Sequence, residues 1–132
     1  MIKIIISIII SFFEREIGGF DNIINTLLIF IIMDYITGIM KAIINKRLSS
    51  EIGFKGIFKK VLILFMIAVS NQLDIIFKMP GIRYIVITFY IINEGISIIE
   101  NASLIGLPIP KKIKQTLNNI KTDHKWSVFD FK

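Results

Sequence analysis

Three long apolar stretches, each with a carboxylate on a polar stripe, constrain this chain more than any other feature of its sequence. They cover residues 22–44, 57–77 and 84–105. The carboxylates are Asp34, Asp74 and Glu94. A hydrocarbon core about 30 Å thick is crossed by about 20 helical residues, which each stretch reaches. A charged side chain at mid-bilayer costs about 2.5–3.5 kcal/mol, so we expect these helices to assemble around something polar.

The composition favours an all-α membrane protein. Of the 132 residues, 54% are hydrophobic, which is too apolar for an ordinary soluble domain. Strands of a membrane barrel alternate over about ten residues, whereas these apolar runs are longer and nearly continuous. Lipid offers no partner to unpaired backbone groups, so continuous helices are expected. We predict three transmembrane helices, an N-terminal amphipathic helix and a short basic C-terminal amphipathic helix.

The N-terminal region, residues 1–19, is predicted to be an amphipathic helix at the membrane surface. Its polar side chains recur at steps of four, four and three residues, which places them on one helical face. They are Lys3, Ser7, Ser11 and Glu14. The segment is short for a span, although a fourth, tilted span is the alternative reading. Gly18 and Gly19 are expected to end this helix, and Asp21 to cap the next one.

Residues 20–105 form the predicted three-helix transmembrane region, and residues 106–132 a basic cytoplasmic tail. A polar loop is expected over residues 45–56 and a tight turn at the Pro-Gly pair of residues 80–81. Residues 110–121 are expected to form the basic amphipathic helix of the tail, with Ile113 and Leu117 on its apolar face.

Basic residues near the span ends predict the orientation. They flank the first loop and the tail, and they serve as topology signals or contacts for lipid headgroups. This set comprises Lys46, Arg47, Lys55, Lys59, Lys60, Lys111, Lys112 and Lys114. The turn between spans two and three holds only Lys78 and Arg83. The positive-inside rule therefore places the C-terminus in the cytoplasm and the N-terminus outside.

Each predicted span has its polar residues on a single helical face, which indicates a pore lining or an oligomer contact. This candidate polar face comprises Asp34, Gly38, Lys41, Asn71, Asp74, Tyr90, Glu94, Ser97 and Asn101. An equally weighted alternative is that the acids are protonated, or paired with Lys41 and with each other, and only hold helices together. For Asp74, a local pair with Lys78 is the preferred interpretation.

The sequence offers no signature of an enzyme. Cysteine is absent, and the single histidine, His124, lies in the polar tail. The acids show no metal-ligand spacing, and Ser49 and Ser50 have no base nearby. We therefore expect no catalysis, cofactor or metal. Nucleic-acid binding is not expected either, because the basic groups flank apolar spans without a recognition motif.

Two segments resemble the toxin secretion/phage lysis holin family of Gram-positive bacteria and their phages. The first contains Asp34, Gly38 and Lys41, followed by the polar loop with its two glycines. The second runs from Glu94 through Asn101 to the Gly-Leu-Pro-Ile-Pro junction at residues 106–110, which is the most specific part. The resemblance covers about residues 30–115. It marks Asp34, Gly38, Lys41, Glu94 and Asn101 as motif positions.

The resemblance implies a multi-pass protein of the bacterial cytoplasmic membrane that oligomerises with itself and opens lesions. Such lesions let an endolysin reach the cell wall or let a large toxin leave, with the cargo passing through unbound. The expected partners are membrane lipid and further copies of the chain. Two other readings stay open: a small oligomeric ion channel or transporter subunit using Asp34 and Glu94, and a membrane anchor for a partner protein.

Overall fold

The computed structural model describes residues 1–78 and 81–119, and these residues form helices joined by short turns, with no strand among them. The four long helices are α1 (Ile2–Glu16), α2 (Asn22–Ile44), α3 (Ser50–Phe77) and α4 (Ile82–Ile105). A short helix follows over residues 111–119. The prediction of an all-helical protein is confirmed.

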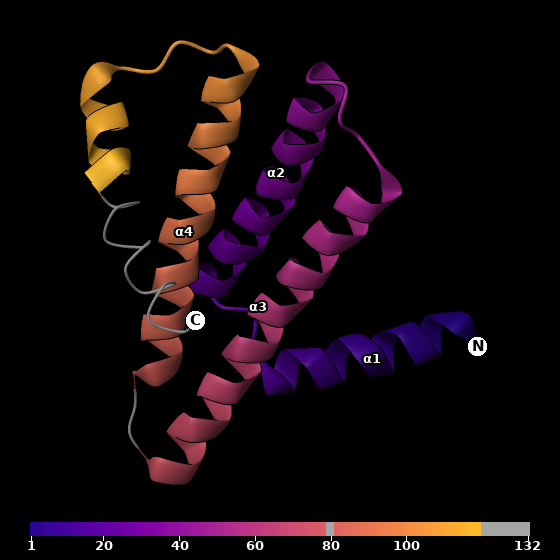
Figure 1. The fold of residues 1–132 in the computed structure, drawn as a ribbon. Coiled ribbons are helices and arrows are strands. Elements are labelled where there is room, and N and C mark those ends of the chain that lie inside the picture. Colours follow the sequence, from indigo (N-terminus) through magenta and orange to yellow (C-terminus); the bar gives the residue numbers. More distant parts are fainter. Residues whose placement is uncertain (79–80, 120–132) are drawn as a thin grey trace.

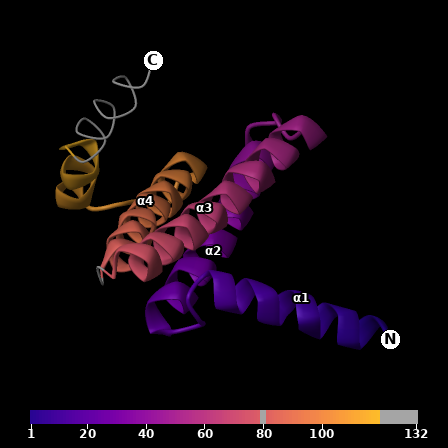
Figure 2. The same cartoon turned by 90° about the horizontal axis from the view of Figure 1, so that it is seen from below.

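Helices α2, α3 and α4 lie together, and α1 extends away from them (Figure 1). Helix α4 packs along both α2 and α3, whereas α2 and α3 touch each other only sparsely. Helices α2 and α4 run in the same direction, and α3 runs in the opposite one. Seen from below, α1 leaves the other helices sideways, so that its N-terminus lies far from them (Figure 2).

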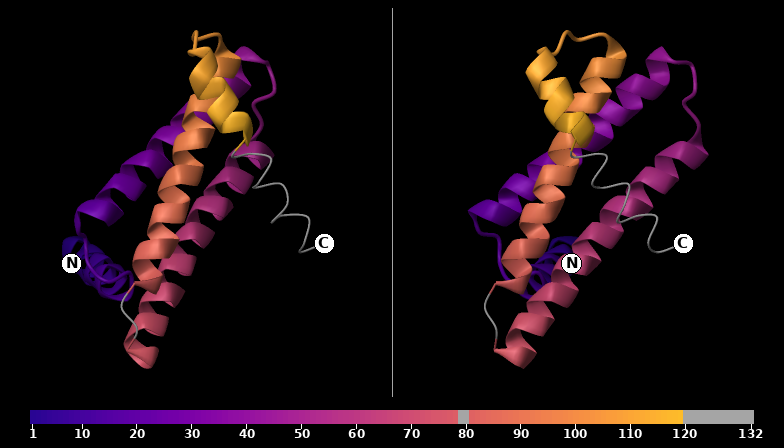
Figure 3. Two further views of the ribbon diagram at one scale, coloured as in Figure 1. Left: turned by 90° about the vertical axis from the view of Figure 1, so that its left-hand side faces the viewer. Right: turned by 60° about the vertical axis from the view of Figure 1, so that its left-hand side comes forward.

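Side-chain caps set the beginnings of two helices. Asp21 accepts a hydrogen bond from the Ile24 amide at 3.1 Å, as predicted, and begins α2. Ser49 accepts one from the Ile52 amide at 3.2 Å and begins α3 at Ser50. The predicted polar loop over 45–56 is therefore wrong in its second half, because the Ser49 cap lets helix start there. After α4, Gly106 adopts a φ of +116°, and residues 111–119 run back beside the end of α4 (Figure 3).

A small apolar core lies among the helices, while most of the outer surface is equally apolar. The buried core side chains come from the 17–21 junction and from α2, α3 and α4: Ile17, Ile24, Leu27, Ile31, Ile63, Ile67 and Ile87. Outward-facing side chains of similar size stay exposed, such as Ile29, Phe65 and Ile85. Apolar surface on this scale is a mark of contact with a membrane or a partner.

Two helices, α2 and α4, are long and apolar enough to cross a membrane by length and composition. Helix α3 is not among them within the described residues, so the predicted set of three spans is not confirmed. Helix α3 also carries more charged residues than α2 or α4: they are Glu51, Lys55, Lys59, Lys60 and Asp74.

Candidate functional site

A buried charge network joins the three packed helices near their middles. The Nζ atom of Lys60, on α3, forms ion pairs with Oδ2 of Asp34 on α2 and with Oε2 of Glu94 on α4, the latter at 2.6 Å. Asp34 and Glu94 are only 8% and 3% exposed. One cation therefore lies between two carboxylates, and with all three groups ionised the network has one net negative charge.

Asn101 completes the network from the next turns of α4. Its Nδ2 atom donates to Oδ1 of Asp34 at 3.1 Å and to Oγ1 of Thr37 at 3.0 Å. Asn101 itself is 5% exposed. Seven residues separate it from Glu94, which is two helical turns, so both side chains leave α4 on the same face. The two oxygens of Asp34 thus have different donors, from α3 and from α4.

Glycines allow the close helix packing around the network. A Cβ atom at Gly95 would lie 3.4 Å from the Phe30 ring of α2, and one at Gly56 would lie 3.3 Å from the Tyr35 ring. Both gaps are filled by an aromatic side chain of α2, so larger residues would push α4 or α3 away from it. Small residues that let helices approach are typical of packing in membranes.

The residues of the candidate polar face divide into groups in the structure. Asp34, Glu94 and Asn101 meet in the charge network. Gly38, Lys41 and Ser97 line a cleft of about 490 Å³ beside it. Tyr90 packs against the apolar core, with its ring centroid 5.1 Å from that of Phe89. Asn71 and Asp74 belong to a second polar cluster.

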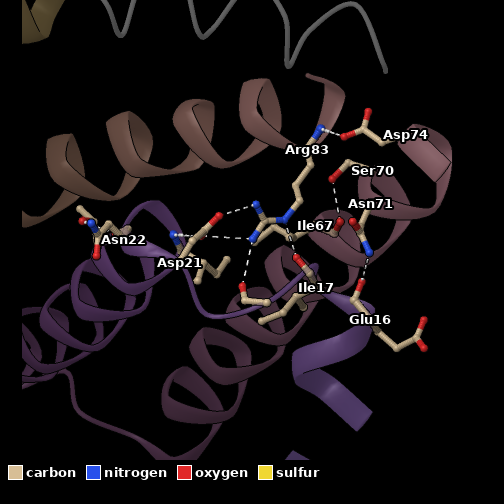
Figure 4. A network of polar contacts seen from close by, with 12 residues as sticks. Glu16, Ile17, Asp21, Asn22, Ile67, Ser70, Asn71, Asp74 and Arg83 are labelled. Carbon is tan, nitrogen blue, oxygen red and sulfur yellow. Dashed lines mark hydrogen bonds and ion pairs between the residues drawn. The ribbon is translucent and has the colours of Figure 1, made fainter. Parts of the chain in front are cut away.

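This second cluster ties the junction between α1 and α2 to α3 and α4 (Figure 4). The Arg83 guanidinium donates to the carbonyl oxygens of Ile17 and Gly19 at 2.5 and 3.1 Å, and to Oδ2 of Asp21 at 2.9 Å. Asn71 donates to the Glu16 carbonyl oxygen at 3.0 Å. The end of α1 is therefore held through its backbone.

Asp74 has a capping role in this cluster. Its two carboxylate oxygens accept hydrogen bonds from the backbone amides of Ile82 and Arg83 at 2.9 and 3.1 Å. These amides open α4 and have no partner within the helix. The expected local pair with Lys78 is therefore wrong: Lys78 ends α3 in the left-handed conformation with φ of +51°, and Asp74 turns to α4 instead.

Sequence reasoning assigned Lys60 to the basic topology set, whereas the structure places it between two buried acids. A signal was present, because Lys60 lies on the same face of its helix as Ile67 and Asn71. The alternative pairing of Asp34 with Lys41 is wrong, because Asp34 is paired with Lys60. Arg83 lies in the turn before the third stretch and on the polar stripe of that stretch, and it makes four side-chain hydrogen bonds to residues more than 60 positions away.

The remaining basic residues of the topology set gather at one end of the molecule. Lys46 and Arg47 lie in the connection after α2, and Lys55 and Lys59 lie in the first turns of α3. Lys111, Lys112 and Lys114 are exposed on the short helix over 111–119. Both basic segments lie at the end of the helices opposite to the start of α4 (Figure 1).

The Arg83–Asp21 contact predicts a pH dependence. The hydrogen bond from Arg83 lowers the pKa of Asp21 below its usual 3.8. Stability from this contact is therefore fully present above that value and is lost as the pH falls through the lowered pKa of the folded protein. We expect Asp21→Asn to destabilise the purified protein at neutral pH, with the difference from the parent chain shrinking below pH 3.8. Unfolding in detergent micelles at a series of pH values measures this, and a difference independent of pH would contradict it.

Comparison with known proteins finds a family model and a phage relative that agree with each other. The sequence model of the bacteriophage holin family matches residues 11–122. An uncharacterized 14.9 kDa protein of Clostridium perfringens is 45% identical over 105 residues, covering 78% of this chain and 80% of the relative. A probable holin of Bacillus phage phi105 is 37% identical over 99 residues, covering 74% and 73%. No solved structure matches the chain.

Proposed function

This chain belongs to the bacteriophage holin family, and from that premise we propose that it assembles with copies of itself in a bacterial cytoplasmic membrane and opens lesions there. The lesions would release an endolysin or a large protein toxin. The observation that carries the proposal is the buried network of Asp34, Lys60 and Glu94 inside helices whose outer surface is apolar. Such a chain is suited both to lipid and to a polar interior.

The direction of the helices supports a layout with three spans. If α2 and α4 both cross the membrane in the same direction, the chain between them has to cross back, and α3 is the segment available. Its charges are compatible with this because Lys60 is paired with both carboxylates, while Lys55 and Lys59 lie nearer its start. The basic residues at that end favour a cytoplasmic C-terminus and an external N-terminus.

Helix α1 fits a place at the outer membrane surface. Nearly all of its side chains are exposed, including the apolar ones, and it touches the other helices chiefly through its last turn. A helix with one polar face and a large apolar face binds in the plane of the interface. The Arg83 and Asn71 contacts would hold it there at the outer end of α3 and α4.

The proposed mechanism uses the network in two arrangements. In a single chain, Lys60 and Asn101 satisfy the two acids, so the polar groups are hidden from lipid. In an oligomer the same groups, with neighbouring Gly38, Lys41 and Ser97, would face water at a lesion. Hydration would replace the ion pairs, and the apolar outer surface would stay in contact with lipid. No step requires catalysis or a cofactor.

Neutralising the acids is expected to change the time at which lysis begins. Asp34→Asn and Glu94→Gln each remove one ionised group of the network, which alters the balance between the hidden and the hydrated arrangement. We expect lysis onset to shift after timed induction in bacteria, with membrane insertion intact by fractionation. Glu14→Gln is the matched control, because Glu14 is an exposed acid outside the network. Unchanged onset in both network variants would count against the mechanism.

Release of protein from protoplasts distinguishes the proposed function from its alternatives. Protoplasts lack a cell wall, so a large cytosolic reporter enzyme leaves them only through a membrane lesion. Induced expression should release the reporter abruptly. Ion flux without release of the reporter would instead favour a channel that uses Asp34, which lines the cleft. If neither reporter release nor ion flux occurred, a membrane anchor for a partner protein would be the remaining interpretation.

A further inference from the structure

The cleft beside the charge network is strongly basic. It lies between the second half of α2 and the first half of α3, with Ser97 and Asn101 of α4 contributing to its wall. Its basic lining residues are Lys41, Arg47, Lys55, Lys59 and Lys60. Among the described residues that line it, only Asp34 has a carboxylate. The cleft therefore gathers far more positive than negative charge.

Most of these basic groups have no carboxylate partner among the described residues of the protein. Lys60 is occupied by Asp34 and Glu94. Among residues 1–78 and 81–119, Lys41, Arg47, Lys55 and Lys59 form no ion pair with a carboxylate. Lys55 and Lys59 are four residues apart on α3 and so project on one side of it, towards the cleft that both line. Like charges brought together in this way repel one another until an anion joins them.

The cleft also has an apolar side. Ile39, Ala42, Leu48 and Ile52 contribute to its lining beside the basic groups. Its lining residues come mainly from the second half of α2, the connection after it and the first half of α3. Figure 1 shows that α2 and α3 diverge towards this connection, which carries the basic residues Lys46 and Arg47. In a protein that crosses a membrane as proposed above, this end is at the cytoplasmic headgroup level. A ligand for this site therefore combines an anionic group with a hydrocarbon chain.

We propose that the cleft binds the phosphodiester headgroup of one anionic phospholipid, such as phosphatidylglycerol. Lys41, Arg47, Lys55 and Lys59 hold the phosphate, and the apolar side of the cleft contacts the acyl chains. Basic pockets between membrane helices on the cytoplasmic side recognise such headgroups. The single negative charge of the phosphate lies between the lysines of α2 and α3 and offsets part of their repulsion, so it holds the two helices together where they otherwise touch sparsely. The inference rests on the proposed membrane function for its setting, while its test does not require lysis.

Native mass spectrometry of the full chain in a non-ionic detergent tests this site. Titration with phosphatidylglycerol should yield one tightly retained lipid per chain, and phosphatidylcholine should be retained much more weakly. K55Q/K59Q should lower the affinity for phosphatidylglycerol about 30-fold, since each basic residue near a headgroup contributes roughly a factor of five to the affinity. The matched control K111Q/K112Q removes the same charge outside the cleft and should change affinity less than about twofold. K55R/K59R should retain the lipid, and circular dichroism checks that each variant is helical.

Three outcomes would overturn the proposal. If both double glutamine variants lowered the affinity for phosphatidylglycerol equally, the lipid would be held by the overall positive charge and not by a site in the cleft. Equal retention of phosphatidylcholine would remove the role of the anionic group. Displacement of the lipid by inorganic phosphate or glycerol phosphate at equal concentration would assign the cleft to a free phosphate instead. Failure of the protoplast assay with lipid retention intact would overturn only the proposed lesion function.

Discussion

Lys60→Gln is expected to destabilise the protein by about 3–5 kcal/mol, the typical loss when one partner of a buried ion pair is removed. Asp34 and Glu94 would then face each other without the ammonium group that both now contact. Of the two acids, only Asp34 accepts a hydrogen bond from Asn101, and this bond adds no positive charge. The variant should accumulate poorly in the membrane, and the onset of lysis should be delayed or lost.

Unfolding by added denaturing detergent, followed by circular dichroism, measures this loss. Lys111→Gln is the matched control: its side chain is exposed and lies outside the network and the cleft, and the change should cost less than about 0.5 kcal/mol. The triple variant Asp34→Asn/Lys60→Met/Glu94→Gln removes all three charges and should recover most of the stability, because no unpaired charge is left. If Lys60→Gln were as stable as Lys111→Gln, the network would not be a stabilising element.

Gly18→Ala is expected to loosen the attachment of α1 to the other helices. Gly18 has a φ of +88°, and a Cβ atom there would lie 2.5 Å from Nε of Arg83 and 2.8 Å from Oδ1 of Asn71. The left-handed conformation costs a residue with a side chain about 1–2 kcal/mol. Displacing Arg83 from the backbone oxygens that it binds would add about 1–3 kcal/mol. We expect a total loss of about 2–5 kcal/mol.

Gly19→Ala isolates the role of the contact. Gly19 has a similar φ of +97°, but nothing lies within 4 Å of a Cβ atom placed on it. It should lose only the conformational part, about 1–2 kcal/mol. Limited proteolysis of the purified protein adds a local readout, since cleavage between α1 and α2 should rise in Gly18→Ala and much less in Gly19→Ala. Equal behaviour of the two variants would mean that the Arg83 contact contributes little.

Local signals in the sequence explain the helices well, although not all of their ends. The first predicted stretch and α2 occupy the same residues, because Asp21 and the pair of glycines before it act within a few residues. Helix α3 begins seven residues before its predicted stretch, because the Ser49 cap lies inside the predicted loop. Helix α4 begins two residues early because Asp74, from the preceding helix, accepts hydrogen bonds from its first amides.

In the candidate site, too, some features follow from spacing along one helix and others depend on how the helices pack. The face on which Asp34, Glu94 and Asn101 lie follows from their spacing, because a helix has a fixed number of residues per turn. Which cation meets these acids does not follow, because spacing along one helix says nothing about the rotation or height of its neighbours. Lys41 was the nearer candidate in sequence, and Lys60 is the partner in space.

The sequence by itself therefore determined that the protein is helical, that its surface is apolar and that each long helix has one polar face. The reason is that these properties depend on composition and on the helical period. Only the tertiary structure decided that Lys60 serves two acids, that Arg83 and Asp74 secure the helix ends, and that four further basic groups share a cleft with no carboxylate partner among the described residues. Those pairings depend on how α4 packs against α2 and α3, and no single helix contains that information.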